Sequence, residues 1–119
     1  MVLSMSPAVA LTPELRAELV HGLSDASRQR ILDTLRGREQ RVADIVELTG
    51  LSQPNASKHL RCLRECGLVE GEKRGREVFY ALVDGLPEVL DALDGLLERV
   101  APQMASCTLT DRTRGCCDA

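Results

Sequence analysis

Cysteine is the residue type whose spacing in this chain suggests chemistry. The 119 residues include five cysteines, and Cys62 and Cys66 stand four residues apart in the stretch SQPNASKHLRCLREC. That stretch has the pattern of a helix, on which residues four apart are neighbours, so two thiolates there could bind one metal ion. A lone buried cysteine is more often a small apolar side chain. The chelating spacing, together with Cys107, Cys116 and Cys117 in a polar tail, favours metal binding.

The available ligands restrict the ion. A site made of thiolates alone suits Cd(II), Pb(II), Hg(II), As(III), Cu(I) or Zn(II), whereas harder ions need carboxylates. The chain has only His21 and His59, so a His-rich zinc site is not expected, and we expect His59 to pack or to contact a phosphate. Cys107 is the expected third ligand, because it follows the last predicted helix closely enough for a tail to fold back. Cys116 and Cys117 could supplement it, form a second soft site or be reactive terminal thiols.

The same predicted helix has a polar and basic side. With residues about 100° apart, Ala56, Leu60 and Leu63 fall together and are expected to face the core. Early residues of a recognition helix contact base edges, where Asn and Gln suit adenine and Lys suits guanine, while Arg61 suits a phosphate. The residues predicted to contact DNA are Ser52, Gln53, Asn55, Ser57, Lys58, Arg61, Lys73, Arg74 and Arg76. A run of charge in isolation more often indicates a solvated face, so the neighbouring elements must decide.

Those neighbouring elements indicate a winged helix-turn-helix. The segment VADIVEL predicts a short amphipathic helix, Gly50 supplies a turn, and Ser52 caps the next helix, which Gly67 ends. A strand from Val69 to about Lys73 and a second strand in EVFYALV predict a hairpin with basic residues near its tip. We therefore expect a mainly α fold with a small β-hairpin that binds DNA.

Further helices are predicted on both sides of this unit. They run from Pro13 to about Gly22, through ASRQRILDTLRG, and through PEVLDALDGLLERVA, which Pro102 is expected to stop. The broad apolar stripe of the last helix, with that of the first, exceeds what a small core needs and is a candidate homodimer face. The predicted organisation is a flexible N-terminal arm at 1–11, a winged helix-turn-helix DNA-binding and dimerisation domain at 12–101, and a cysteine-containing tail at 102–119.

Composition narrows the class of protein. One Tyr, one Phe and no Trp leave a core of aliphatic side chains, which suits packed helices. The net charge of −3 argues against a protein that coats nucleic acid by overall charge, but the basic stretch between Lys58 and Arg76 fits a site-specific DNA-binding protein. No signal peptide or membrane span is evident, so we expect a cytoplasmic protein with reduced thiols and no membrane partner.

From ASRQRILDTLRG to GREVFYALV the sequence resembles the ArsR family of winged-helix metal-sensing repressors. The family pattern includes LglsqpnvSkHL..Lr..GLV and r.Gr.v.Y.l, and the resemblance covers about residues 14–100. It implies a homodimer that binds double-stranded operator DNA when metal-free and releases it on binding the ion, with no small-molecule substrate.

An enzyme is not expected. A thiol enzyme in particular is disfavoured, since there is no Cys-x-x-Cys next to a βαβ pattern.

Within the family, Cys62 and Cys66 with Cys107 resemble the CmtR-type cadmium and lead sensors, in which the tail cysteine comes from the other subunit. Cd(II) or Pb(II) is therefore the expected ion, with As(III), Hg(II) or Zn(II) as alternatives. Arsenic sensors of the founding type have cysteines in ELCVCDL where this chain has EQRVADI, and zinc and nickel sensors use His on the last helix, which lacks His over residues 88–100. A repressor that senses thiol redox state through the tail cysteines, without metal, is the remaining alternative.

Overall fold

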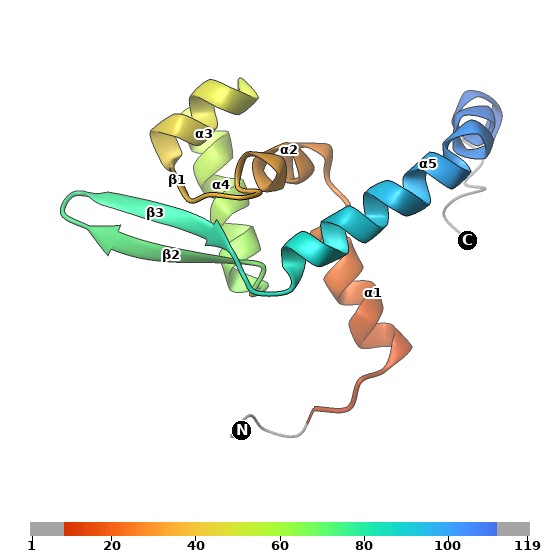
Figure 1. The fold of residues 1–119 in the computed structure, drawn as a ribbon, viewed down its shortest axis with the longest axis horizontal. Coiled ribbons are helices and arrows are strands. Elements are labelled where there is room, and N and C mark those ends of the chain that lie inside the picture. The colour runs from red at the N-terminus through yellow and green to blue at the C-terminus, as the bar shows by residue number, and fades with distance from the viewer. Residues whose placement is uncertain (1–8, 112–119) are drawn as a thin grey trace. The chain divides into compact units, whose positions relative to one another are not determined.

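A computed structural model describes the backbone of residues 9–111 and the side chains of residues 9–105, in two units divided between Val83 and Asp84. Residues 1–8 of the predicted arm, as well as Cys116 and Cys117, lie outside the described residues. The first unit contains α1 (Pro13–Gly22), α2 (Ala26–Thr34), β1 (Gln40–Arg41), α3 (Val42–Thr49), α4 (Gln53–Glu65), β2 (Val69–Arg74) and β3 (Glu77–Leu82), and the second contains α5 (Leu86–Asp111) (Figure 1).

Polar side chains begin three of the helices. Thr12, Asp25 and Ser52 each accept a hydrogen bond from the backbone N–H three residues further on, at 3.1, 3.0 and 3.3 Å. Each bond satisfies a donor that has no partner within the helix itself. The predicted starts of α1, α2 and α4 are confirmed.

The core of the first unit is aliphatic and lies where α2, α3 and α4 pack on one another. On α4 the three residues expected to face inward, Ala56, Leu60 and Leu63, are fully buried. Burying a leucine side chain contributes roughly 1.5–3 kcal/mol, so this face fixes how α4 is rotated. The other buried apolar residues of the unit are Ile31, Leu32, Leu35, Ile45, Leu68 and Val69.

A glycine turn joins α3 to α4. Gly50 has φ +77° and its N–H donates to the carbonyl of Val46 at 2.9 Å, which ends α3 in the left-handed conformation that favours glycine. The predicted helix-turn-helix is confirmed. Leu48, one of the apolar residues of the predicted amphipathic helix, is exposed, because the buried face of this short helix is centred on Ile45.

The sheet has three strands in the order β1-β3-β2, all antiparallel, rather than the two strands of the predicted hairpin. The additional strand, β1, has only Gln40 and Arg41, too few residues to leave a period in the sequence. Between β2 and β3 a two-residue turn of Gly75 and Arg76 closes the hairpin, with Gly75 at φ +64°. This hairpin is the wing of the fold.

The last helix is longer than predicted. α5 continues through Pro102 to Asp111, so the expectation that Pro102 ends the helix is wrong, and residues 102–111 of the predicted tail are helical. A proline inside a helix removes one hydrogen bond and bends the axis, but a long helix can continue past it. Among the described residues, no helix is long and apolar enough to cross a membrane.

Candidate metal and DNA-binding site

The first half of α4 presents the predicted base-contacting residues to solvent. Gln53, Asn55, Ser57 and Lys58 are exposed, and so is Arg61. In the part of the chain that the structure describes, no ion pair engages Lys58 or Arg61, so their charges are available to phosphate. The remaining predicted contact on this helix, Ser52, is exposed and uses its hydroxyl oxygen as the helix cap.

The second half of α4 holds the two thiols. Cys62 is half-buried, Cys66 is exposed, and both are free cysteines. Partial loss of water around the sulfur raises the pKa of the Cys66 thiol, and the neighbouring Cys62 thiol raises that pKa further. The two sulfurs are therefore close together, and a soft ion that binds them must displace their protons.

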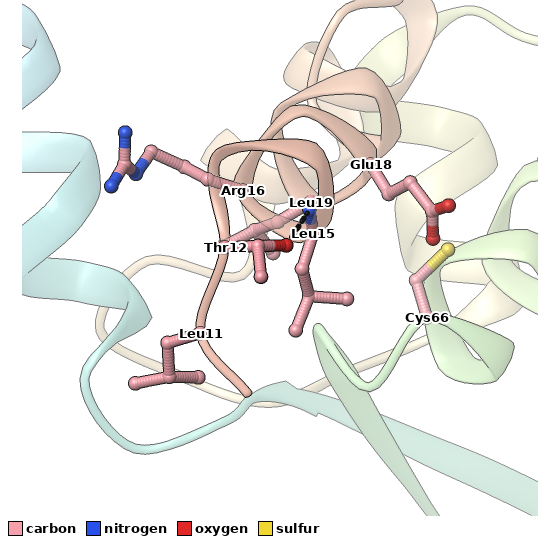
Figure 2. Close-up of a pocket in the computed structure, with 7 residues that line it drawn as sticks. All are labelled: Leu11, Thr12, Leu15, Arg16, Glu18, Leu19 and Cys66. Atoms are coloured by element: carbon pink, nitrogen blue, oxygen red, sulfur yellow. Dashed lines mark hydrogen bonds between the residues drawn. The ribbon is translucent and has the colours of Figure 1, made fainter. Parts of the chain in front are cut away.

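Cys66 also faces a cavity beside α1. The cavity has a volume of about 590 Å³ and is lined by Leu11, Thr12, Leu15, Arg16, Glu18, Leu19 and Cys66. In Figure 2 the Glu18 carboxylate and the Cys66 sulfur point toward one another across this cavity. A Cβ atom added at Gly22 would lie 3.6 Å from the Cys66 sulfur, so α1 ends in close contact with α4.

One cation lies near the thiols. Arg28 donates from Nε to the carbonyl of Gly22 at 2.8 Å, and its charge opposes the rise in the pKa of Cys66. Neither Arg28 nor Glu18 was singled out from the sequence. Both are far from Cys66 along the chain, so only the fold relates them to the thiols.

His59 is half-buried on α4, and its Nε2 lies 3.9 Å from the Asp25 carboxylate. The pKa of Asp25 is lowered, first by the hydrogen bond from the Arg28 N–H and also by the charges of His59 and Arg28. This placement supports the prediction of a packed histidine, because its neighbour is the cap of α2 and not a thiol.

The described side chains supply only part of a metal site. Within residues 9–105, no group of three or more His, Cys, Asp or Glu side chains could hold one ion. Cys62 and Cys66 fit a soft ion in type and proximity, as two ligands of an incomplete set. Cys107 belongs to α5, but its side chain lies outside the described part, as do Cys116 and Cys117.

The three predicted cations of the wing differ in their surroundings. Lys73, Arg74 and Arg76 are all exposed. Arg74 forms ion pairs with Glu39 at 2.7 Å and Glu72 at 2.6 Å, whereas no ion pair of Lys73 or Arg76 occurs within the described residues. A hollow of about 250 Å³ beside the wing is lined by both Arg76 and Gln53, so the tip of the wing and the start of α4 border the same space.

Comparison with known proteins identifies the family of this fold. A family model described as "Bacterial regulatory protein, arsR family" matches residues 25–71. The solved structure of the transcriptional repressor BigR from Xylella fastidiosa is 30% identical, with a TM-score of 0.65 over 70% of this chain and 86% of that chain. The chain belongs to the arsR family of bacterial regulatory proteins. The resemblance of the sequence to the ArsR family is therefore confirmed.

A second solved structure of the family type confirms the fold class. It is a homodimeric winged helix-turn-helix DNA-binding domain from Mycobacterium bovis, described as a possible ArsR-family transcriptional regulator. Its TM-score is 0.64 at 27% identity, covering 76% of this chain and 84% of that chain. The predicted mainly α winged helix-turn-helix is therefore correct.

Two curated relatives are regulators with different names. A probable mercury resistance operon repressor of Streptomyces lividans is 35% identical over 79 residues, or 66% of this chain. The HTH-type transcriptional regulator CmtR of Mycobacterium tuberculosis is 42% identical over 78 residues, or 62% of this chain. The chain spans 62% and 66% of the lengths of these two proteins. Both are regulators, in agreement with the expectation that the chain is not an enzyme.

Proposed function

We propose that this protein is a metal-responsive transcriptional repressor, which binds double-stranded operator DNA as a metal-free homodimer and releases it on binding a soft ion. One observation carries the proposal. The thiols of Cys62 and Cys66 lie at the C-terminal end of α4, the helix whose first turns present Gln53 and Asn55 to solvent. An ion bound at one end of this helix acts directly on the element that contacts DNA.

The chain's own residues suggest how binding and release are coupled. Cys62 and Cys66 would hold the ion, and Cys107 is the proposed third ligand. A ligand from another element would restrain α4 in an orientation that need not fit the major groove. A coupling free energy of about 1–3 kcal/mol weakens DNA binding by about 5–150-fold, which is enough for a switch.

The proposed ion is Cd(II) or Pb(II). Thiolate ligands favour soft ions, and the arrangement of Cys62, Cys66 and Cys107 resembles the CmtR type. Hg(II) is the second candidate, supported by the 35% identity to a probable mercury resistance operon repressor, and As(III) or Zn(II) remain alternatives. Absorbance titration of the reduced protein with each ion, through the thiolate-to-metal charge-transfer band, would rank their affinities and give the number of ions per dimer.

Apolar side chains on α1 and α5 support the proposed homodimer. The exposed set comprises Leu15, Leu19, Val20, Val89, Leu93, Leu96, Leu97 and Met104. Monomeric proteins rarely leave so many large aliphatic residues exposed on two helices, and a second copy would cover them. Sedimentation velocity should give a dimer, and Leu96→Asp should shift it toward monomer.

The test of the sensor uses Cys62→Ser, which retains the size of the side chain and removes the soft ligand. Because α4 keeps its DNA-facing residues, we expect unchanged operator affinity but no release on adding Cd(II), measured by fluorescence anisotropy of a labelled duplex. Cys116→Ser, outside the proposed trio, is the matched control and should still release. A Cys62→Ser protein that dissociates with Cd(II) at the wild-type concentration would refute the proposal.

The thiol-redox alternative is distinguished in the same assay. Release by peroxide in the presence of a chelator, reversed by dithiothreitol, would support oxidation of the tail cysteines as the signal. Retention of DNA under peroxide, with release by metal alone, would support the metal sensor.

A further inference from the structure

The ion pairs of the wing form a pattern that the proposed function does not use. Arg74 makes two contacts with Glu39, at 2.7 and 2.9 Å, and one with Glu72 at 2.6 Å. Its guanidinium also lies over the ring of Phe79, 4.6 Å from the centroid. The two-point geometry with a carboxylate and the stacking on an aromatic ring together define the position of this side chain.

These partners lie on one face of the sheet. Arg74 pairs with Glu77 in the register of β2 and β3, and Glu72 pairs with Phe79. Because side chains alternate along a strand, Arg74 and Glu72 share a face that Lys73 does not. To reach Glu39, which directly precedes β1, the Arg74 side chain must cross strand β3.

A second ion pair joins the other strand of the hairpin, β3, to β1, with the base and the acid exchanged. Arg41, at the start of α3, donates to Glu77 at 3.0 Å and to Asp44 at 2.9 Å. Arg74 and Glu77 are the last paired residues before the turn, so both ends of the hairpin tip are tied to the segment that enters α3. These links therefore connect the wing to the first helix of the helix-turn-helix.

The charge on this face does not suit DNA. Arg74 and its two carboxylate partners carry one net negative charge, and Arg74 lowers the pKa of Glu39, which keeps that carboxylate ionised. A phosphate that approached Arg74 would have to displace both carboxylates and would meet their repulsion. Lys73 points to the other face, and Arg76 lies in the turn, so neither competes with these carboxylates.

We propose that Arg74 is a positioning residue of the wing, which holds the hairpin against the entrance of α3 and leaves DNA contact to Lys73 and Arg76. This inference rests on the proposed DNA-binding function and revises the role predicted for one of its residues. The border that Arg76 shares with Gln53 places the contacting side of the wing next to the start of α4.

The salt dependence of binding separates contact from positioning. A duplex selected from a random-sequence library by the wild-type protein is the probe, and its affinity is measured over a series of salt concentrations. Arg76→Gln should reduce the slope of log K against log salt by about 1.8, because the homodimer loses one phosphate contact in each subunit and each contact contributes about 0.9. Arg74→Gln should weaken binding by about 2–5-fold with the slope unchanged, because it loosens the wing without removing a contact.

A charge exchange tests the same point with the fold intact. In a Glu72→Gln background, Glu39→Arg combined with Arg74→Glu reverses the link, and the affinity should return to within about 2-fold of Glu72→Gln alone. Thermal unfolding of each variant by circular dichroism establishes that it folds.

Two outcomes overturn this inference. The first is a slope for Arg74→Gln that falls as much as that for Arg76→Gln. The second is an exchanged protein that binds no better than Arg74→Glu in the same Glu72→Gln background. If the wild-type protein enriches no duplex from the library, the repressor proposal itself fails, and the assignment of Arg74 fails with it.

Discussion

The recognition helix α4 and the wing both bring cations to the surface, but different interactions hold the two elements in place. α4 is fixed by side chains with no solvent exposure, including Leu60 and Leu63. The wing is fixed near its tip by exposed ion pairs of Arg41 and Arg74. Apolar packing is nearly independent of salt, whereas ion pairs at a surface weaken as salt rises. The orientation of α4 should therefore be constant under conditions that loosen the wing.

The cations of α4 and of the wing also differ in how available their charge is to DNA. Lys58 and Arg61 have no ion-pair partner within residues 9–105, so their charge is available to DNA. Arg74 is also an exposed cation, yet two carboxylates already engage it. The number of cations in a segment is thus an upper limit on the number of its ionic contacts with phosphates.

The largest effect should come from the core under α4. Leu63→Ala removes a fully buried side chain and should lower the free energy of unfolding by about 2–5 kcal/mol, measured by urea denaturation. Leu48→Ala, at a leucine with 57% exposure on α3, is the control and should change it by less than about 0.5 kcal/mol. Equal losses for the two variants would mean that α4 is not held by packing.

A smaller effect is expected where packing does occur in the wing. A Cβ atom at Gly71 would lie 3.1 Å from atoms of both Tyr80 and Val78, closer than ordinary contact, so Gly71→Ala should destabilise the protein by roughly 1 kcal/mol. Glu70→Ala, at the neighbouring exposed position of β2, should be close to neutral. Thermal unfolding compares them, and a neutral Gly71→Ala would show that the hairpin adjusts freely.

Loss of the cap should affect α4 alone. Ser52→Ala removes the hydrogen bond to the Asn55 N–H and should cost about 1 kcal/mol of stability, with a matching loss of order in the turn that contains Gln53. Ser57→Ala leaves the cap in place and should change stability by no more than about 0.5 kcal/mol. Amide hydrogen exchange of Asn55 and Ala56 is the direct measurement, and protection that survives in Ser52→Ala would contradict the expected role of the cap.

Acid should affect the start of α3 before it affects α4. Hydrogen bonds from Arg41 lower the pKa of Asp44, so this carboxylate stabilises the fold above the pKa of an unfolded Asp, about 3.9, and stops doing so as pH falls through its lower folded value. Asp44→Asn should therefore be less stable than wild type at neutral pH, and the two melting temperatures should approach one another as pH falls from about 4 through the lower folded pKa. A difference that persists at lower pH would assign the effect to packing and not to charge.

Local signals in the sequence were sufficient for the helices of the DNA-binding unit. Ser52 as a cap, Gly50 as a turn and the spacing of Ala56, Leu60 and Leu63 each act within a few residues, and the structure agrees with all of them. β1 was not predicted, because two residues gain their strand conformation from pairing with Tyr80 and Phe79, about 40 residues away.

The surroundings of the candidate site were harder to predict for the same reason. The identity and spacing of Cys62 and Cys66 are local features of the sequence, and the soft-ion site was inferred from them alone. The contacts that modify them are distant in sequence, as Gly22 and Arg28 show, and so is the pairing of Arg74 with Glu39. Charge and spacing in a sequence identify candidates, whereas the fold decides which of them are already engaged.

The continuation of α5 through Pro102 changes how Cys107 relates to the residues before it. On a flexible tail, an inserted residue would hardly alter where a thiol can reach. On a helix, one inserted residue advances every later position by about 1.5 Å and rotates it by about 100°. The five steps from Pro102 to Cys107 therefore define a direction as well as a length.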